Sequence, residues 1–333
     1  MRISSSFDLL YVYMSRSRKM KIGFLGCGAI GSIYAGYLSN KHDVYIVDTS
    51  QKVVDAVRAH GILIDECVPG AGNGETISCR PALITTDPAE VGTVDLLIVF
   101  VRYMYLEAAC RNALPMIGKD TIVMTLQNGI GNYDEIAKVV PEDQIVIGNT
   151  SHGSTGIAPG HVRHMGIGVT YIGSLKAPIA KAYKAAEALT AAGFETVVRE
   201  DDVMAVIWHK AFANVAINAI TALLGETNSL ISSNEYARKA AGLLVNEAID
   251  VAIAGGCQID REAELKHAFD VAESTAANKS SMLQDVEGKR QTEIMIINGA
   301  VSKIGREHNI PTPYNDMIVQ LILAKESLYL GER

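Results

Sequence analysis

The chain has 333 residues, of which 48% are hydrophobic and 20% are charged. This length and composition suit about two globular domains and exclude a disordered chain or a small disulfide-based scaffold. Acidic residues outnumber basic ones by 37 to 30, and the net charge of −7 argues against a general nucleic-acid binder. An anionic substrate is compatible with this charge only where a few cations gather locally.

The cysteines and the N-terminal segment bear on the cellular compartment. Five cysteines without a C-x-x-C pair predict a reducing compartment and no structural metal. We see no apolar run of the roughly 18 residues that a membrane span needs, so we expect a cytoplasmic protein without membrane contact. Residues 1–19 hold an apolar run, Phe7–Met14, whose positive charges mostly follow it, whereas a signal peptide would place them before it. We interpret them as a disordered extension, or as the product of an upstream start codon with Met20 as the natural start.

Short apolar runs alternate with amphipathic segments over the first 200 residues. The run Val94–Val101 is typical of a central parallel strand that is covered on both faces. Strands that alternate with helices predict an α/β fold with a Rossmann-type, doubly wound parallel sheet. The predicted strands cover residues 21–25, 44–47, 94–101, 121–126 and 144–147, and helices are predicted at 29–38 and 51–60.

The pattern changes after residue 150. Residues 150–174 are rich in Gly, Thr and His and predict antiparallel strands or loops, before a helix at 176–192 and a strand at 196–198. From residue 203 onward, apolar residues recur at helical spacing, at 203–224, 234–255, 261–273, 291–308 and 314–328. We therefore predict an extension (1–19), a dinucleotide-binding domain (20–200) and an all-helical C-terminal domain for substrate binding and dimerisation (201–333).

A glycine-rich loop joins the first predicted strand to the first predicted helix. In the pattern G-x-G-x-x-G, the first glycine allows the tight turn, the second lets a pyrophosphate approach, and the third lets helix and strand pack closely. The first N–H groups of the helix would face the phosphates. We predict dinucleotide binding here, the alternative being a glycine turn without a ligand. The residues of the loop are Gly26, Cys27, Gly28, Ala29, Ile30 and Gly31.

An acidic residue ends the second predicted strand. Asp48 lies 22 positions after Gly26, where a carboxylate can accept hydrogen bonds from the adenosine ribose and would repel a 2′-phosphate. Its presence favours NAD(H) over NADP(H).

The segment 208–218 (W-H-K-A-F-A-N-V-A-I-N) places three polar residues on one helix face. Lys210, Asn214 and Asn218 are spaced by four residues and stand among apolar neighbours. A lysine in apolar surroundings can have a lowered pKa, which suits a general acid. A structural amide ladder with a lysine that extends to solvent explains the same spacing equally well.

A third polar stretch covers residues 278–285 (N-K-S-S-M-L-Q-D) and continues to Thr292 and Glu293. Taken alone, Thr292 and Glu293 are best explained as caps of the next helix.

Together these stretches resemble the ketopantoate reductase (2-dehydropantoate 2-reductase) family from about Met20 to the C-terminus. The matching segments are G-C-G-A-I-G at 26–31, L-Q-N-G-I-G-N at 126–132, P-G-H-V-R-H at 159–164, the segment at 208–218, and N-K-S-S-M-L-Q-D at 278–285 with T-E-I at 292–294. The resemblance implies NAD(P)H-dependent reduction of 2-dehydropantoate to (R)-pantoate, a step of pantothenate and coenzyme A biosynthesis.

The resemblance also implies residue roles. Lys210 would be the catalytic general acid, Glu293 would bind the substrate hydroxyl or orient Lys210, and Asn128 would lie near the nicotinamide. Glu247 would be structural, although a solvated helix face explains it as well. Four further residues would bind the substrate: Asn214, Asn218, Asn278 and Ser281.

Two positions depart from the family pattern. Asp48 stands where the family often has a basic residue for the 2′-phosphate of NADPH, and Arg102 replaces a lysine that lies close to the cofactor. Arg102 would touch the cofactor, or would be a surface arginine at a strand end. The alternatives that remain are a reductase of another branched 2-keto acid and a cofactor-binding regulator without catalysis. We also expect the helical half to allow a homodimer.

Overall fold

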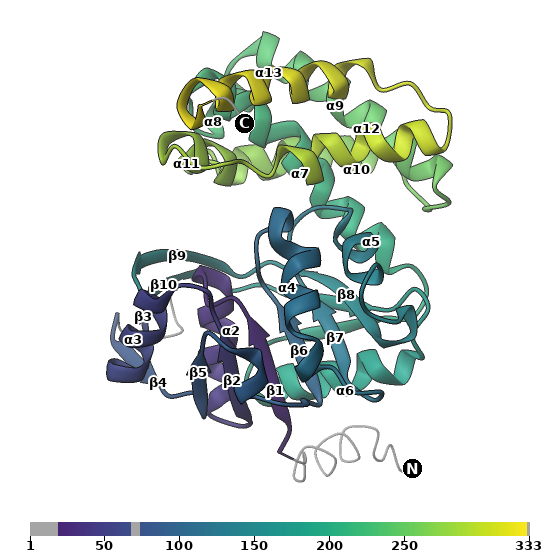
Figure 1. The fold of residues 1–333 in the computed structure, drawn as a ribbon. Helices are drawn as coiled ribbons and strands as arrows, with labels where there is room; N and C mark the ends of the chain where they lie inside the picture. Colours follow the sequence, from purple (N-terminus) through teal and green to yellow (C-terminus); the bar gives the residue numbers. More distant parts are fainter. Residues whose placement is uncertain (1–18, 68–73, 332–333) are drawn as a thin grey trace, which may run out of the picture. The chain divides into compact units, whose positions relative to one another are not determined.

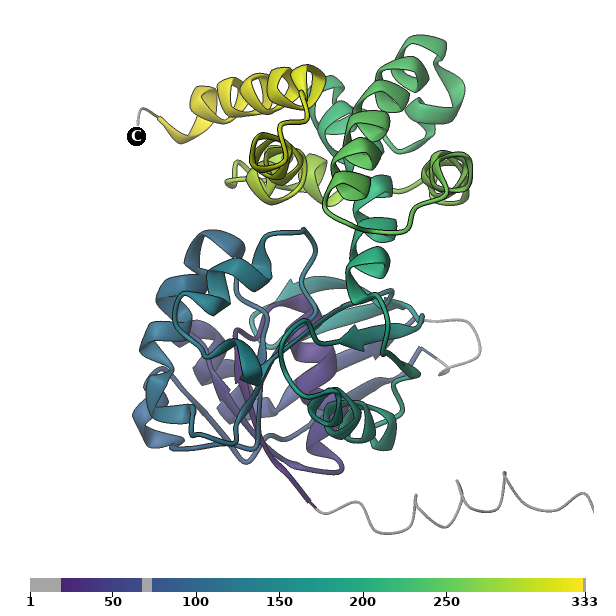
Figure 2. The same ribbon diagram turned by 90° about the vertical axis from the view of Figure 1, so that its right-hand side faces the viewer.

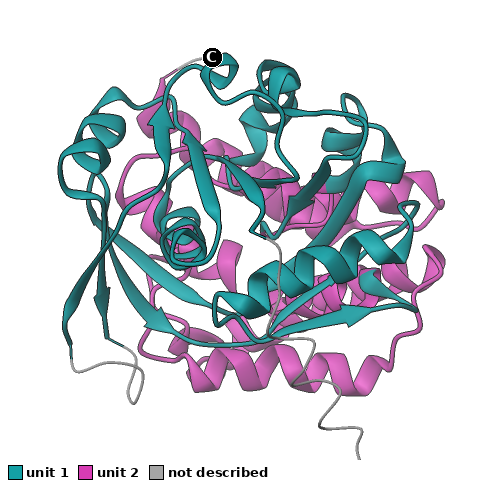
Figure 3. Cartoon of the chain, turned by 90° about the horizontal axis from the view of Figure 1, so that it is seen from below, with its two compact units in different colours: residues 1–127, 133–203 teal, residues 128–132, 204–333 magenta. Residues whose placement is uncertain are grey.

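The computed structural model describes residues 19–67 and 74–331. The chain forms two compact units (Figure 3). Unit 1 comprises Met1–Gln127 and Tyr133–Val203, and unit 2 comprises Asn128–Asn132 and Met204–Arg333. The short segment Asn128–Asn132 thus belongs to unit 2, although the chain on both sides of it belongs to unit 1. The extension predicted for residues 1–19 lies outside the described residues except for Lys19.

Unit 1 is built on an eight-stranded sheet with the strand order β12-β11-β8-β7-β6-β1-β2-β5 (Figure 1). Described neighbours run parallel except β11, which is antiparallel to β8. The strands run outward in both directions from β1 and β6, so the predicted doubly wound fold is confirmed, with its switch point between these two strands. The strands are β1 (Lys21–Leu25), β2 (Asp43–Val47), β5 (Leu83–Thr85), β6 (Leu96–Val99), β7 (Ile122–Thr125), β8 (Ile145–Thr150), β11 (Thr170–Gly173) and β12 (Thr196–Arg199).

The central strands are apolar because both of their faces are buried. Every residue of β6 and β7 is buried, as expected for strands that are covered on two sides. The predicted strands at 94–101 and 121–126 are therefore present but shorter, because their flanking residues form the loops at the sheet edges.

A smaller sheet of order β4-β3-β10-β9 contacts α2 (Ala29–Ser39), which also packs on β2. A Cβ atom at Gly36 would lie 2.7 Å from Ile64 Cδ1, so helix and small sheet touch closely there. The pairing of β10 with β9 confirms antiparallel structure within 150–174, whereas β3 and β4 were not predicted. The strands are β3 (Ile62–Glu66), β4 (Thr76–Cys79), β9 (Gly153–Ala158) and β10 (His161–Gly166).

The segment P-G-H-V-R-H at 159–164 has a structural role in this sheet. His161 Nε2 lies 2.9 Å from Asp65 Oδ1, and His164 Nδ1 lies 2.8 Å from Glu66 Oε1. Both pairs join β10 to its parallel neighbour β3. These histidines therefore fasten two distant parts of the chain to each other.

The remaining helices of unit 1 connect the strands of the large sheet. The α-helices are α3 (Gln51–His60), α4 (Leu106–Asn112), α5 (Asn132–Ala137, whose first residue belongs to unit 2) and α6 (Ile179–Ala191). The short 3₁₀ helices are η1 (Pro88–Glu90), η2 (Tyr103–Tyr105), η3 (Leu114–Met116) and η4 (Glu142–Gln144).

Unit 2 is helical, as predicted (Figure 2). Its longest helix, α7, has 22 residues and is long and apolar enough to cross a membrane by length and composition. The expectation that no apolar run reaches this length is therefore wrong, although most of α7 is buried within the fold. The elements are α7 (Val203–Leu224), α8 (Ser229–Ser233), α9 (Glu235–Ala254), α10 (Arg261–Ser274), α11 (Ser281–Glu287), η5 (Ile294–Ile296), α12 (Asn298–Glu307) and α13 (Pro313–Leu330).

The single helix predicted at 291–308 is wrong. The chain forms η5 and then α12, separated by Ile297, whose φ of −103° and ψ of −92° are not helical. The carbonyl oxygen of Ile296 accepts a hydrogen bond from Ile130 N at 3.2 Å. Because the Ile296 carbonyl binds a loop that is distant in the sequence, it does not accept the hydrogen bond that would continue a helix. Apolar periodicity alone does not reveal this contact.

Candidate functional site

The glycine loop has the geometry that its sequence predicts. Gly26 has a φ of +89°, which favours glycine, and its N–H donates to Val47 O at 2.9 Å. A Cβ at Gly31 would lie 2.6 Å from Gly26 O, so only glycine fits where α2 meets the loop. A Cβ at Gly28 would meet nothing within 4 Å, so this backbone borders open space.

The start of α2 fits a pyrophosphate. Gly28 is the N-cap residue and has no side chain to accept a hydrogen bond from the first turn. The N–H groups of Ala29, Ile30 and Gly31 lie in that turn, at the positive end of the helix dipole. Cys27 is buried beside Ser32, and burial raises the pKa of its thiol to about 11, so it contributes packing and a backbone N–H rather than a thiolate.

Asp48 is held at the end of β2 by two backbone donors. Its Oδ2 accepts from Cys27 N at 2.7 Å, and its Oδ1 accepts from Ser50 N at 2.8 Å. The carboxylate therefore supports the glycine loop while keeping its negative charge at the mouth of that loop.

A pocket of about 740 Å³ lies at the carboxyl ends of β1, β2 and β6. This is where an open doubly wound sheet binds its ligand. Gly26, Gly28, Asp48 and Arg102 line it, so the structure brings these four predicted residues together. Asp87, which follows β5, lines the same pocket and was missed because the three-residue strand β5 was not recognised.

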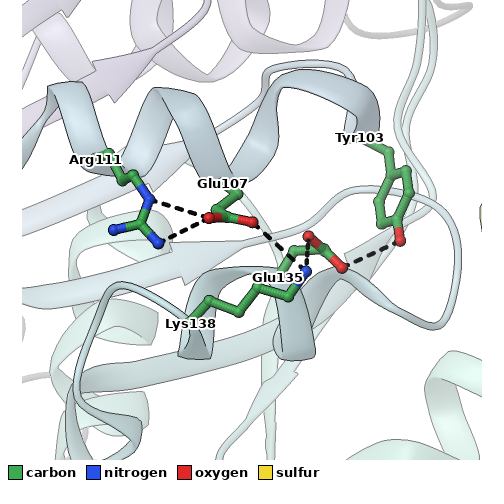
Figure 4. Close-up of polar contacts among 5 residues, drawn as sticks. All are labelled: Tyr103, Glu107, Arg111, Glu135 and Lys138. Atoms are coloured by element: carbon green, nitrogen blue, oxygen red, sulfur yellow. Dashed lines mark hydrogen bonds and ion pairs between the residues drawn. The ribbon is translucent and has the colours of Figure 1, made fainter.

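One wall of this pocket comes from η2 and α4, through side chains such as Tyr105 and Asn112. A polar network fastens this wall to α5 (Figure 4). Lys138 Nζ lies 2.6 Å from Glu135 Oε2 and 3.5 Å from Glu107 Oε2. Glu107 Oε1 in turn pairs with Arg111 Nη2 at 2.8 Å. Tyr103 Oη donates a hydrogen bond to Glu135 Oε1 at 3.3 Å. Hydrogen bonding to Arg111 holds the pKa of the Glu107 carboxyl below its usual range. Each of these exposed pairs is weak because water screens the charges, and together they link α4 to the segment of α5.

In unit 2, α7 carries the predicted polar stripe. Lys210, Asn214 and Asn218 follow one face of this helix, and Asn218 is buried. Burial lowers the pKa of the Lys210 ammonium to about 8. A lysine with such a pKa can give up its proton near neutral pH and recover it from water.

The stripe continues to Thr221, which the sequence analysis missed. Thr221 Oγ1 lies 2.8 Å from Ser280 Oγ, and Ser280 in turn accepts from Leu283 N as the N-cap of α11. This contact brings the segment with Asn278 and Ser281, both exposed, to the later turns of α7. A serine before an apolar pair indicates the start of α11, but the segment is otherwise so polar that its sequence does not predict a helix.

The segment Asn128–Asn132 packs against η5 of the same unit. Gly129 has a φ of +97°, and a Cβ there would lie 2.8 Å from Ile296 O. Asn132 Nδ2 donates to Asn128 O at 2.9 Å and closes the turn. Because Glu293 directly precedes η5, two further predicted site residues, Asn128 and Glu293, stand on adjoining segments.

Two buried carboxylates in unit 2 are structural. Glu247 accepts from the N–H groups of Tyr314 and Asn315 at 2.9 Å each and from Asn315 Nδ2 at 2.8 Å, so it caps the start of α13. The alternative of a solvated helix face is therefore wrong. Glu326 Oε1 accepts from the N–H of Thr292 at 2.7 Å and from its hydroxyl at 2.5 Å. Thr292 thus binds α13 and also accepts from Ile294 N at 3.3 Å.

Both halves of the chain match models of one protein family. The model described as "Ketopantoate reductase PanE/ApbA" matches residues 22–177, and the model for the family's C-terminal part matches residues 202–326. The 2-dehydropantoate 2-reductase of Halobacterium salinarum is 34% identical over 305 residues, which cover 91% of this chain and 98% of that protein. The protein of the same name from Pyrococcus horikoshii is 32% identical over 316 residues, which cover 94% of this chain and 100% of that protein.

Solved structures agree with this match. A D-mandelate dehydrogenase solved with NADH and anilino(oxo)acetate has 30% sequence identity and a TM-score of 0.85, covering 93% of this chain and 99% of that chain. A ketopantoate reductase family member from Ralstonia eutropha has 25% identity and a TM-score of 0.83, covering 93% and 99%. The chain therefore belongs to the ketopantoate reductase family, and it is an NAD(P)H-dependent oxidoreductase with a Rossmann-type nicotinamide-cofactor domain.

Proposed function

We propose that the protein reduces the ketone of 2-dehydropantoate to the alcohol of (R)-pantoate. The observation that carries this proposal is the α7 stripe with Lys210, whose pKa is lowered to about 8, in a chain that also has a complete dinucleotide-binding loop. The nicotinamide cofactor supplies the hydride. A proton from the Lys210 ammonium to the ketone oxygen completes the alcohol, and the neutral amine then regains a proton from water.

The other side chains of the stripe and its neighbours would bind and orient the substrate. Asn214 and Asn218 offer amide donors and acceptors on the face that carries Lys210. Asn278 and Ser281 would hold the substrate hydroxyl and carboxylate. Two residues on the adjoining segments complete the proposed site: Glu293 would bind the substrate hydroxyl or orient Lys210, and Asn128 would approach the nicotinamide.

A direct assay tests this function. The purified protein is mixed with 2-dehydropantoate and either NADH or NADPH, and oxidation of the cofactor is followed by absorbance. We expect turnover with at least one cofactor. Absence of turnover with both would refute the assignment of this substrate.

A second candidate substrate is a 2-keto acid with an aryl or another bulky branched side chain. The likeness to a D-mandelate dehydrogenase at 30% identity over 93% of the chain favours it specifically. The same assay with a panel of 2-keto acids ranks the candidates by kcat/KM. A value for an aryl-substituted acid that exceeds the value for 2-dehydropantoate would reassign the substrate and leave the chemistry unchanged.

We infer that NADH is the preferred cofactor. Asp48 and Asp87 line the pocket together, and two carboxylates would repel the 2′-phosphate of NADPH. Arg102, which also lines the pocket, would lie against the phosphates or the ribose. The likeness to a dehydrogenase solved with NADH supports the same preference.

Removing one negative charge from the pocket tests this preference for NADH. In Asp48→Asn, one side-chain oxygen still accepts from the loop, but the negative charge is gone, so the NADPH-to-NADH ratio of kcat/KM should rise about 10-fold or more. Asp55→Asn, on the exposed side of α3, removes a carboxylate outside the pocket and serves as the control. Equal ratios in wild type and Asp48→Asn would show that Asp48 does not select the cofactor.

A further inference from the structure

The loop between α10 and α11 carries two of the proposed substrate-binding residues, Asn278 and Ser281. Both side chains are exposed, and neither makes a hydrogen bond or an ion pair with the described part of the chain. The two residues between them are engaged: Lys279 Nζ lies 2.7 Å from Glu287 Oε1, and Ser280 is buried. The loop therefore leaves Asn278 and Ser281 available to a ligand and turns Ser280 into the protein.

A chain of hydrogen bonds fixes Ser280. Its Oγ accepts from Leu283 N at 3.1 Å and lies 2.8 Å from Thr221 Oγ1. Thr221 Oγ1 in turn donates to Ile217 O at 2.8 Å, and Asn218 O lies 3.2 Å from the same hydroxyl. Because the one hydroxyl proton of Thr221 is used on these carbonyl groups, Ser280 supplies the proton between the two hydroxyls. The chain thus runs in one direction, from the first turn of α11 to the carbonyl groups of α7.

The contact between the two hydroxyls is shielded from water. Thr221 is 0% exposed and Ser280 is 5% exposed. In such a place a hydroxyl that loses its partner is unfavourable, whereas at the surface water would replace the partner. The position of Ser280 relative to α7 therefore depends on this contact.

A second set of contacts holds the start of the loop. Asn228 N donates to Asn278 O at 2.9 Å, and Asn228 Nδ2 donates to Thr275 Oγ1 at 2.9 Å. Ser229 N donates to Ala276 O at 3.0 Å. Asn228 is buried and directly precedes α8. The backbone is thus fixed at Asn278 by the start of α8 and two residues later by α7.

We propose that Thr221 and Ser280 are positioning residues of the reaction, which hold the loop so that Asn278 and Ser281 bind the substrate hydroxyl and carboxylate without rearrangement. This inference rests on the proposed function of Asn278 and Ser281. Donors that are already held in place bind a ligand without the entropy cost of ordering a loop. They bind the substrate before and during the reaction alike, so their displacement raises KM more than it lowers kcat.

Steady-state kinetics of the full chain test the inference with the 2-keto acid that the wild type reduces best. Thr221→Val keeps the shape of the side chain but removes the hydroxyl, and should raise KM for this acid about 10-fold. The value of kcat should change by less than about 3-fold, and KM for NADH should stay unchanged. Thr221→Ser keeps the hydroxyl and should restore the wild-type KM.

Thr121→Val is the matched control. Thr121 is buried in unit 1, and its hydroxyl donates to Val94 O at 2.6 Å, so the same type of hydrogen bond is lost at the amino end of β7. This variant should keep the wild-type KM for the acid. An equal rise of KM in Thr121→Val would show that the effect comes from general loss of stability, and it would overturn the positioning role.

A double-mutant cycle shows whether the two hydroxyls act through one contact. Ser280→Ala should also raise KM for the acid. Combining Thr221→Val with Ser280→Ala should raise it no further than the larger single effect, because the same contact is lost in each case. Effects that multiply in the double variant, or an unchanged KM in Thr221→Val, would contradict the inference.

Amide hydrogen exchange gives a measurement that needs no substrate. Leu283 N donates to Ser280 Oγ, and Gln284 N donates to Ser280 O at 3.0 Å. Both amides should exchange about 10-fold faster in Thr221→Val than in the wild type or in Thr121→Val. Equal exchange in all three proteins would overturn the role of the contact, whatever the substrate. A wild type that does not turn over 2-dehydropantoate refutes only the proposed substrate and leaves this measurement intact.

Discussion

Replacing Lys210 with alanine should lower kcat by 10²–10⁴-fold, the range expected for loss of a general acid (about 3–5 kcal/mol). The alcohol oxygen would then have to take its proton from water, without a positioned ammonium to neutralise the developing charge. Steady-state kinetics of the purified variant with saturating cofactor measure the effect. The control is Lys239→Ala, which removes an exposed lysine on α9 that pairs with Glu235, and which should keep the wild-type kcat.

The pH profile gives an independent measurement of the same role. Burial lowers the pKa of Lys210 to about 8, and only its protonated form can act as the acid. We therefore expect kcat for reduction to be highest below pH 8 and to fall as the pH rises through about 8. In Lys210→Arg the charge persists to much higher pH, so this decline should disappear while the rate stays low. A wild-type kcat in Lys210→Ala, or an unchanged decline in Lys210→Arg, would remove Lys210 from the mechanism.

The second large effect concerns stability. Glu247→Ala should lower the free energy of unfolding by about 3 kcal/mol, because it leaves three donors of Tyr314 and Asn315 without their acceptor in a buried place. At the scaling for units of this size, the Tm should fall by ~10 °C. Thermal unfolding followed by circular dichroism measures the change.

Two matched variants make the stability experiment specific. Glu247→Gln keeps one acceptor oxygen and should lose less than half as much stability. Glu235→Ala, at the exposed start of the same helix α9, should cost at most about 1 kcal/mol. If Glu247→Ala were no more destabilising than Glu235→Ala, Glu247 would not anchor α13.

Much of the large sheet could be predicted because its signals are local. The strand Lys21–Leu25 and the helix Gln51–His60 have the predicted bounds, since apolar runs and helical periodicity depend on neighbouring residues alone. Strands β3 and β4 escaped because they belong to a small sheet whose other strands come about 100 residues later in the chain. The pairing of β3 with β10 depends on tertiary contacts that no local pattern contains, although β3 also pairs with β4, its neighbour in the chain.

The residues of the candidate site likewise divide into those that a local sequence pattern predicts and those that depend on tertiary contacts. The glycine loop and the α7 stripe could be found from spacing, because each is one segment with one chemistry. Asp87 and Thr221 could not, since their importance comes from what lies beside them in space. The role of Glu247 depends on the N–H of Tyr314, 67 positions away, so no local pattern distinguishes a buried helix cap from a residue on a solvated helix face.

The passage of Asn128–Asn132 through unit 2 changes how the chain can be divided. The polypeptide crosses between the two units after Gln127, after Asn132 and after Val203, so three covalent links join them rather than one. A fragment that begins at Met204 would lack the loop whose Ile130 N–H satisfies Ile296 O, and η5 would lose its support. The helical unit is thus not a module that can be exchanged between relatives by a single cut. A functional chimera would have to carry the five-residue loop together with its η5 partner.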